Sequence, residues 1–371
     1  MAYTTIDDPS KYFQVELYTD GDASTDDTTS QTFDGNSDLQ PDWMWFKSRN
    51  VTGNHGHMDT SRGKTGGSFV ILRNTTDAEQ TPASGYDFTS MNSDGFSYGR
   101  ANQLDVAHDT PANNTVWAWK ANGGTTTTND ASSTGVGTID SVYQANTTAG
   151  FSIVTYTGNG SSGASFAHGL GVAPQYVLIK NRDTARSWFV GHPSPGYNFI
   201  AGHLNSTDDK DEDSVYWNNT APSSTVVTLG NNEGGNENGD KFVAYCFAPI
   251  QGYSHFASVE GNNNADGPFA YTGFKPAWVM LKNIDATGKV WQIWDSARDT
   301  SNVANHTLTG DATTTEHSDG SGASNHIDML SNGFKIRNTG SHLNPDGQTL
   351  IYMAFAESPF VSSEGVPTTA K

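Results

Sequence analysis

The sequence contains a single cysteine, Cys246, within the apolar run 242–248. One thiol cannot form an internal disulfide, so the disulfide framework that stabilises many small secreted domains is excluded. A lone cysteine in an apolar run is typically a small buried hydrophobe rather than a nucleophile. Stability is therefore expected to come from packed cores and from assembly.

Basic residues are scarce: Lys and Arg total 20 against 40 Asp and Glu, which gives a formal net charge of −20. Such a chain repels phosphate backbones and anionic lipid surfaces, so neither nucleic acid nor a membrane is an expected partner. No apolar run approaches the roughly 20 residues of a membrane-spanning helix, which predicts no membrane insertion. The first residues lack the basic segment and apolar stretch of a secretory signal, so synthesis in the cytoplasm is expected.

The sequence also lacks a convincing amphipathic helix. Aromatic residues make up 11 % of the chain, and its 39 glycines are mixed with Asn, Thr, Ser and Asp between short apolar runs. The aromatic content excludes a wholly disordered chain, and the turn-forming residues indicate many short strands. The composition predicts an all-β fold.

One motif occurs three times: Pro, a variable residue, an aromatic, three apolar residues and Lys. The copies are 41–47, 174–180 and 276–282, and each Lys lies six positions after its Pro. The apolar runs 116–121, 243–248 and 351–356 follow the three copies. Repetition of this kind indicates a repeated structural unit.

These repeats predict three tandem β-sandwiches of a jelly-roll or lectin-like type, each a separate folding unit. Their expected bounds are 1–122, 150–252 and 253–360, with 123–149 as a linker or long loop and 361–371 as a C-terminal tail. Proline suits the start of a strand because no ladder bond is lost there. Asp94-Gly95 and Asn332-Gly333 each predict a hairpin turn.

The tryptophans near the first motif are more numerous than one small core requires. Trp43, Trp45, Trp117 and Trp119 lie within or near the two longest apolar runs of the first copy. This density predicts packing between units or between subunits. It also favours a homo-oligomer, with a trimer preferred to a dimer.

No catalytic, cofactor-binding or metal-binding residue is assigned from the sequence. His55, His57 and Asp59 alternate and would share one face of a strand, as metal ligands require. A polar strand edge explains them equally, because the other copies have no such cluster. The acidic run 208–213 has carboxylates for calcium but lacks the spacing of an EF-hand loop, so a solvated loop is favoured. Cofactors are therefore expected to be none.

Sugar binding is chemically more plausible than catalysis, since sugars stack on aromatic rings. The candidate glycan-contacting residues lie near polar segments and are Trp188, Tyr197, Trp217, Trp291 and Trp294. The alternative is that these rings fill cores, as large aromatics usually do. Both readings stay open at this point.

Four phrases of the sequence resemble a family of virion structural proteins from marine bacteriophages, including cyanophage-like tail-fibre proteins with repeated β-sandwiches. The phrases are 94–99, 156–160, 168–182 and 352–357, and the opening residues 3–7, 13 and 17–19 are similar as well. The third copy departs from the pattern because its first strand lacks the Tyr-Thr-Gly phrase of 156–158. The resemblance implies no catalytic residues.

The resemblance implies a non-enzymatic structural protein on the virion surface, in a tail fibre or tail tip that contributes to host attachment. It would be made in the host cytoplasm, and its expected partners are other virion proteins and host surface glycans. A head decoration or outer capsid protein is the first alternative. A carbohydrate-binding module or glycan depolymerase is the second, although forty acidic residues cannot single out a catalytic pair.

Overall fold

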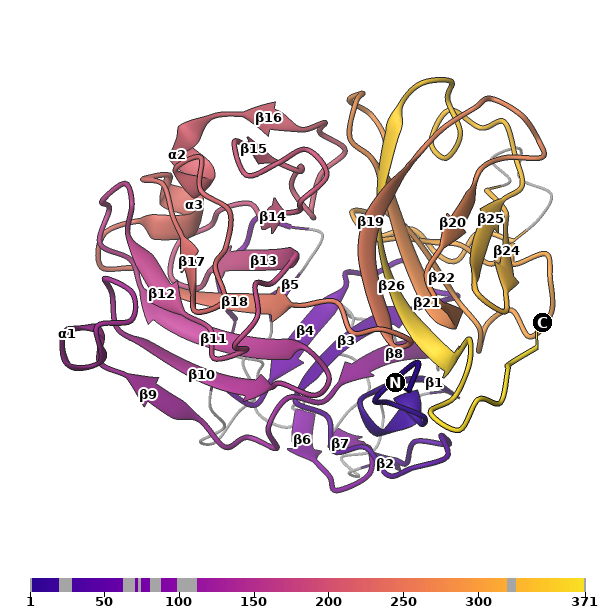
Figure 1. Ribbon diagram of the computed structural model, residues 1–371, viewed down its shortest axis with the longest axis horizontal. Coiled ribbons are helices and arrows are strands. Elements are labelled where there is room, and N and C mark those ends of the chain that lie inside the picture. The colour runs from indigo at the N-terminus through magenta and orange to yellow at the C-terminus, as the bar shows by residue number, and fades with distance from the viewer. Residues whose placement is uncertain are drawn as a thin grey trace.

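The computed structural model describes residues 2–19, 29–62, 71–72, 75–80, 88–98, 112–318 and 325–369. Antiparallel strands form nearly all of the regular structure in these ranges, so the predicted all-β class is confirmed (Figure 1). The short helices are η1 (Pro9–Lys11), α1 (Ala131–Thr134), α2 (Ser214–Trp217) and α3 (Glu233–Asn236). No helix in the described ranges is long and apolar enough to cross a membrane.

Three large sheets dominate the described structure. In spatial order, the first contains β1 (Phe13–Thr19), β8 (Asn113–Trp119), β3 (Trp43–Ser48), β4 (Gly56–Asp59) and β5 (Ile71–Leu72). The second contains β14 (Phe189–Gly191), β13 (Tyr176–Asn181), β18 (Lys241–Phe247), β11 (Phe151–Thr157), β10 (Ser141–Asn146) and β9 (Thr127–Asn129). The third contains β19 (Ser254–Glu260), β26 (Thr349–Pro359), β21 (Phe274–Asn283), β22 (Gln292–Asp295) and β23 (Leu308–Thr309).

The three Pro-to-Lys motifs occupy the same place in their sheets. Each lies on or directly before a strand that pairs with the later apolar run, and that run pairs in turn with the first strand of its copy. The registers correspond, since Trp43 pairs with Trp119, Tyr176 with Phe247, and Trp278 with Phe355. Positions in one sheet can therefore be compared with positions in the others.

A small sheet lies against each large sheet. These are β2 (Thr29–Gln31), β7 (Phe96–Tyr98) and β6 (Phe88–Met91) in the first case, and β12 (Ser165–Ala167) with β17 (Val226–Thr228) in the second. The third is β20 (Phe269–Tyr271), β25 (Gly333–Ile336) and β24 (Ile327–Leu330), and the pair β15 (Phe199–Ile200) and β16 (Asp211–Glu212) stands apart from these. Each small sheet shares a buried apolar cluster with its large sheet, which gives β-sandwich packing.

Both predicted hairpin turns are present. β6 pairs with β7 around Asp94-Gly95, and β24 pairs with β25 around Asn332-Gly333. Gly95 has a φ of +101°, and a Cβ there would lie 2.0 Å from the carbonyl oxygen of Gln31. Only glycine fits that position, because a side chain would be both strained and in collision with the β2 backbone.

The other faces of the three large sheets meet in one common core. Seven of the nine tryptophans lie in this shared cluster, together with Phe247, Phe355 and residues of all three sheets. The ring of Trp43 stacks on Tyr245 at 4.5 Å, and Trp119 meets Phe355 at 5.5 Å. The predicted inter-unit role of the tryptophans near the first motif is thus confirmed. The three sandwiches are present, but they are not independent bodies, since their large sheets bury one face against each other.

The segment 123–149 is not a linker, contrary to prediction. It contains β9, α1 and β10, and β10 pairs with β11 along its whole length. Its Thr- and Asn-rich composition is compatible with a strand because only one face of β10 is apolar: Tyr143 and Ala145 pack on the second sandwich. The predicted tail also contacts the body, where the backbone N–H of Ser363 donates to Asp7 at 2.6 Å.

Candidate functional site

A buried ion network joins the first sheet to the second. Asp59 ends β4, and Arg62 lies three residues later with a side chain that is 1 % exposed and an ion pair to Asp59. The Tyr245 hydroxyl of β18 donates to Asp59 at 2.7 Å. Glu79 then bridges Arg62 and Arg182, at 2.8 Å from each. Every charge in the chain of contacts has an opposite neighbour, which is the condition under which buried charges are tolerated.

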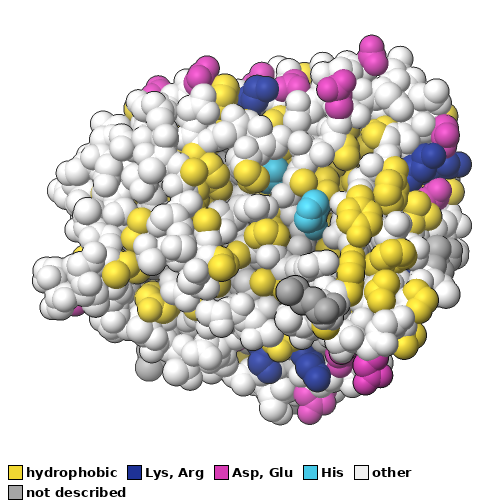
Figure 2. Space-filling view, viewed as in Figure 1, with side chains coloured by type: hydrophobic (Ala, Val, Ile, Leu, Met, Phe, Trp, Pro, Cys, Tyr) yellow, Lys and Arg dark blue, Asp and Glu magenta, His cyan; other side chains and the backbone are white. Residues whose placement is uncertain are grey.

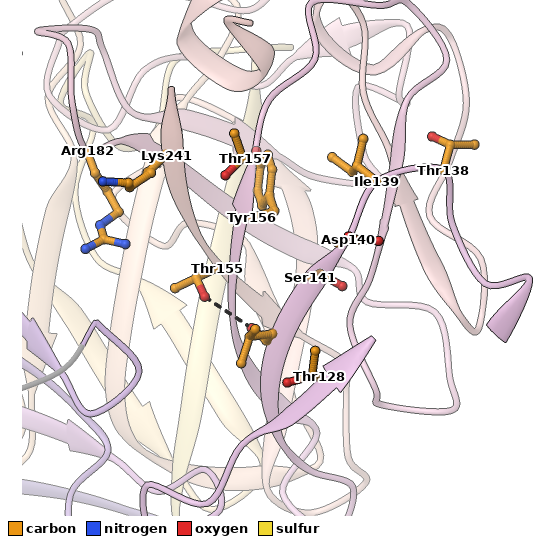
Figure 3. Close-up of a pocket in the computed structure, with 11 residues that line it drawn as sticks. Thr128, Thr138, Ile139, Asp140, Ser141, Thr155, Tyr156, Thr157, Arg182 and Lys241 are labelled. Carbon is orange, nitrogen blue, oxygen red and sulfur yellow. Dashed lines mark hydrogen bonds between the residues drawn. The ribbon is translucent and has the colours of Figure 1, made fainter. Parts of the chain in front are cut away.

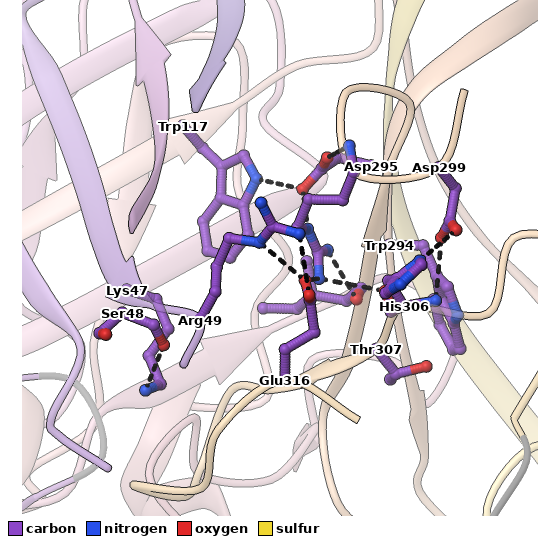
Figure 4. A network of polar contacts seen from close by, with 12 residues as sticks. Lys47, Ser48, Arg49, Trp117, Trp294, Asp295, Asp299, His306, Thr307 and Glu316 are labelled. Atoms are coloured by element: carbon purple, nitrogen blue, oxygen red, sulfur yellow. Dashed lines mark hydrogen bonds and ion pairs between the residues drawn. The ribbon is translucent and has the colours of Figure 1, made fainter. Parts of the chain in front are cut away.

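A matching network joins the third sheet to the first (Figure 4). Asp295 ends β22, and Arg298 binds it at 2.6 Å with both side chains fully buried. The indole N–H of Trp117 donates to Asp295 at 2.9 Å. Glu316 bridges Arg298 at 3.1 Å and Arg49 at 2.9 Å. Burial alone would raise the pKa of Glu316, but the hydrogen bonds and charges of the two arginines outweigh it and lower that pKa.

The contact between the second and third sheets is built differently. His192 and Pro195 occupy the positions that correspond to Asp59 and Arg62 in the first sheet and to Asp295 and Arg298 in the third. Burial lowers the pKa of His192 to about 3, so the ring is neutral at physiological pH. A partly exposed ion pair, Lys210 with Asp285, crosses this contact instead. Buried ion pairs therefore connect the first sheet to each of the other two. The ion pair between the second and third sheets lies nearer the surface.

The motif lysines Lys47, Lys180 and Lys282 are all buried. Lys180 donates to the carbonyl oxygens of Thr76 at 3.0 Å and Arg186 at 2.6 Å. Lys282 donates to the carbonyl of Lys289 at 2.5 Å. Burial lowers the pKa of Lys180 to about 7 and that of Lys282 to about 8, because an ammonium loses its hydration there.

These lysines predict a pH dependence of stability. A lysine pKa of about 7 in the folded state and about 10.4 in the unfolded chain means that unfolding takes up a proton between those values. The free energy of unfolding should therefore rise as pH increases from 7 to 9, with Lys282 contributing above about 8. Urea titrations at pH 7, 8 and 9 would measure the slope. The double variant Lys180→Met, Lys282→Met should flatten it, and an unchanged slope would contradict the assignment.

His55, His57 and Asp59 do share one face, as their alternation predicts. That face points into the shared core, where the indole N–H groups of Trp45 and Trp43 donate to His55 Nδ1 at 2.8 Å and His57 Nδ1 at 3.1 Å. Asp59 is occupied by Arg62. Within the described ranges, no group of three or more His, Cys, Asp or Glu side chains is placed to hold a metal ion. The two histidines therefore accept hydrogen bonds from tryptophans in the core, and Asp59 belongs to an ion pair.

The five aromatics predicted to contact glycans are buried, which corrects that prediction. Trp188, Trp217 and Trp294 are 0 % exposed, Trp291 is 1 % and Tyr197 is 8 %. Two of the indole N–H groups bond within the fold: Trp291 donates to the carbonyl of His203 at 3.0 Å and Trp294 to the carbonyl of Asn325 at 3.2 Å. The prediction assumed that an aromatic beside a polar segment is exposed. In the structure the loops carry the polar residues, and the aromatic rings point into the cores.

The acidic run 208–213 is divided among structural tasks. Asp213 caps α2 by accepting the N–H of Val215 at 3.0 Å, and Tyr216 donates to Asp211 at 2.7 Å. The five carboxylates of this run thus do not converge on one point, as a calcium site would require. A second acidic segment of the sequence, residues 20–27, is a weaker candidate of the same kind and lies outside the described residues.

The buried thiol of Cys246 gives a simple test of the core. Its side chain is 0 % exposed in the second sandwich, and burial raises the pKa of the thiol. A thiol reagent such as DTNB at pH 8 should therefore leave the native protein unmodified and titrate one thiol per chain in urea. Rapid reaction of the native protein would contradict this packing.

A surface groove of about 560 Å³ lies on the second large sheet (Figure 3). Its lining is mostly hydroxyl-bearing and charged: Thr128, Thr138, Ile139, Asp140, Ser141, Val142, Thr155, Tyr156, Thr157, Arg182 and Lys241. Arg182 is held by Glu79, whereas Lys241 is exposed. Such a surface can donate and accept many hydrogen bonds and can meet an anionic group. Sequence reasoning missed it because β9 and β10, which supply one wall, lie in the supposed linker.

Comparison with known proteins adds a family to this geometry. No curated protein and no solved structure gave a significant match. One family model matches residues 8–359, and it therefore spans all three large sheets and their shared core as one unit. The chain belongs to the family described as the domain of unknown function DUF7483.

Proposed function

We propose that the protein is a non-enzymatic structural component of a bacteriophage particle, displayed on the virion surface in a tail fibre or tail tip. The support for this is the construction of the body: three sheets of matching strand order share one aromatic core and are joined by buried ion networks. A body of this kind resists deformation because its sheets cannot separate without exposing tryptophan and buried charge.

The proposal includes the partners that the sequence predicts. The protein would contact other virion proteins, assemble as a homo-oligomer with a trimer favoured, and meet host surface glycans. Its charge of −20 would favour solubility when many copies are displayed on a particle. A head decoration protein would have the same needs, so the experiment must separate tail from head.

The test uses particles purified from a lysate of a phage whose genome encodes the protein. Mass spectrometry should find the chain in constant ratio to the major capsid protein after gradient purification. Immunogold electron microscopy with antibodies to the chain should label the tail end. Head labelling would favour the decoration alternative, and absence from purified particles would overturn the proposal.

A second candidate, carbohydrate binding, is favoured by the groove on the second sheet. The exposed hydroxyls of Thr128 and Thr157 with the exposed Lys241 suit an acidic sugar, and they replace the buried aromatics as the contact residues. Binding of acidic oligosaccharides on a glycan array should be lost in Lys241→Glu. Lys11→Glu, which changes the charge equally on the N-terminal segment, should bind as the parent does. Equal binding by both variants would exclude the groove.

A further inference from the structure

One segment closes the open side of the second sandwich. Residues 137–146 run along both strand edges there: the N–H groups of Thr138 and Ile139 donate to the Ser165 carbonyl of β12 at 2.8 and 3.1 Å. Ser141 donates to the Ala167 carbonyl at 3.1 Å, and β10 pairs with β11 from 141 to 146. This cover buries Val154 completely and leaves Tyr156 only 5 % exposed.

Within the described ranges, no segment pairs with the corresponding edge of the third sandwich. β19 is the end strand of its sheet and β20 the end strand of the small sheet, and β19 takes the place of β11 in the register. Ala257 and Val259 of β19 correspond to Val154 and Tyr156, yet both are only partly buried against their sandwich. An end strand of this kind offers a row of backbone groups for pairing.

The neighbouring strand shows the same contrast. Phe269 is 43 % exposed and Tyr271 is 52 % exposed, although their counterparts Ser165 and Ala167 are 8 % and 3 % exposed. Hydrophobic side chains gather in Figure 2 over the region where Figure 1 places β19 and β20. A large ring exposed beside an open strand edge marks a contact surface in a protein that is otherwise acidic and polar.

We propose that the β19 edge binds an extended strand from another polypeptide, by strand addition. The chemistry of this strand can be inferred from residues 137–146, which cover the matching edge of the second sandwich. The occupant would pair antiparallel with β19 and direct alternate apolar side chains, at least one of them aromatic, toward Ala257, Val259 and the β20 rings. Backbone bonds supply affinity in this mode, and the alternate side chains supply specificity.

We assign the occupant to another polypeptide because the segment of this chain that has the matching chemistry is already paired. Residues 137–146 are committed to β11 and β12, and a second copy of the chain would have its segment committed in the same way. This inference is independent of the proposed virion role, because it rests on the two matched edges alone.

The test uses a fluorescein-labelled synthetic peptide with the sequence of residues 137–148 and the full-length protein. Fluorescence anisotropy should show saturable binding. The affinity should fall at least tenfold in Val259→Lys, which places a charge in the row facing the peptide, and also in Phe269→Ser, whose exposed side chain can be changed without disturbing a core. Val172→Lys, the same substitution at a residue that is 49 % exposed elsewhere, should bind as the parent does. A peptide with Tyr143 and Ala145 both changed to Asp should not bind.

Each other outcome overturns the proposal. Binding that is insensitive to both edge variants would mean that the peptide exchanges with the chain's own β10. Concentration-dependent dimerisation in sedimentation that is abolished by Val259→Lys would assign the edge to a second copy. Absence of peptide binding to a protein whose circular dichroism spectrum is unaltered would exclude an accessible edge.

Discussion

Arg298→Met should lower the free energy of unfolding by about 3–5 kcal/mol, the cost typical of breaking a buried ion pair from one side. The substitution removes the guanidinium that binds the fully buried Asp295, while Glu316 keeps its ion pair with Arg49. Water cannot replace the lost partner without entry into the interface of the first and third sheets. Urea denaturation followed by tryptophan fluorescence would measure the change.

Arg337→Met is the matched control. Its side chain is 39 % exposed and its partner Asp266 is 70 % exposed, so the same substitution should cost only about 0–1 kcal/mol. If the two variants lost equal stability, the Asp295 network would contribute no more than a surface pair. The equivalent variant Arg62→Met should behave like Arg298→Met, because its network repeats the same contacts.

Trp119→Ala should destabilise the protein by at least about 3–5 kcal/mol, as expected for a fully buried large aromatic. The Trp119 ring touches Trp43 of its own sheet, Phe247 of the second and Trp278 of the third. The cavity therefore opens at the junction of all three sheets. Hydrogen exchange measured by mass spectrometry should show reduced protection in β3, β18 and β26 together.

Trp217→Ala provides the comparison. Trp217 is equally buried, but it belongs to the core of the second sandwich alone. Exchange should increase mainly in the strands around that core, such as β13 and β17, while β26 keeps most of its protection. A uniform increase in both variants would mean that the shared core does not act as a distinct unit.

The strand positions were predictable because they depend on local chemistry. Proline at a strand entrance, an aromatic and three apolar residues give a buried strand wherever they occur, and the Asp-Gly and Asn-Gly turns need no distant partner. The sequence shows that a lysine recurs at the end of each motif copy. It does not reveal that these lysines are buried or that their amines lie against backbone carbonyls.

Features that depend on distant partners could not be predicted. The five aromatics were near polar loops in sequence, but their exposure depends on which sheet each ring faces. The Asp-x-x-Arg spacing at Asp59 and at Asp295 was present in the sequence, and its recurrence could have suggested paired networks. Glu79 and Glu316, which complete them, follow their arginines by 17 and 18 residues, so this spacing nearly recurs as well. The groove could not be predicted because the Thr-rich segment that forms one wall was interpreted as a linker, whereas it forms strands.

The position of β26 has a consequence for the order of synthesis. β26 is formed by residues 349–359, yet it lies between β19 and β21 and carries Phe355 into the shared core. A ribosome therefore makes the indole-rich face of the first sheet some 230 residues before the strand that completes its burial. During that interval the nascent chain exposes the surface most prone to aggregation. A premature stop before residue 349 would leave that surface open permanently, so truncated products should precipitate or be degraded rather than accumulate as partial domains.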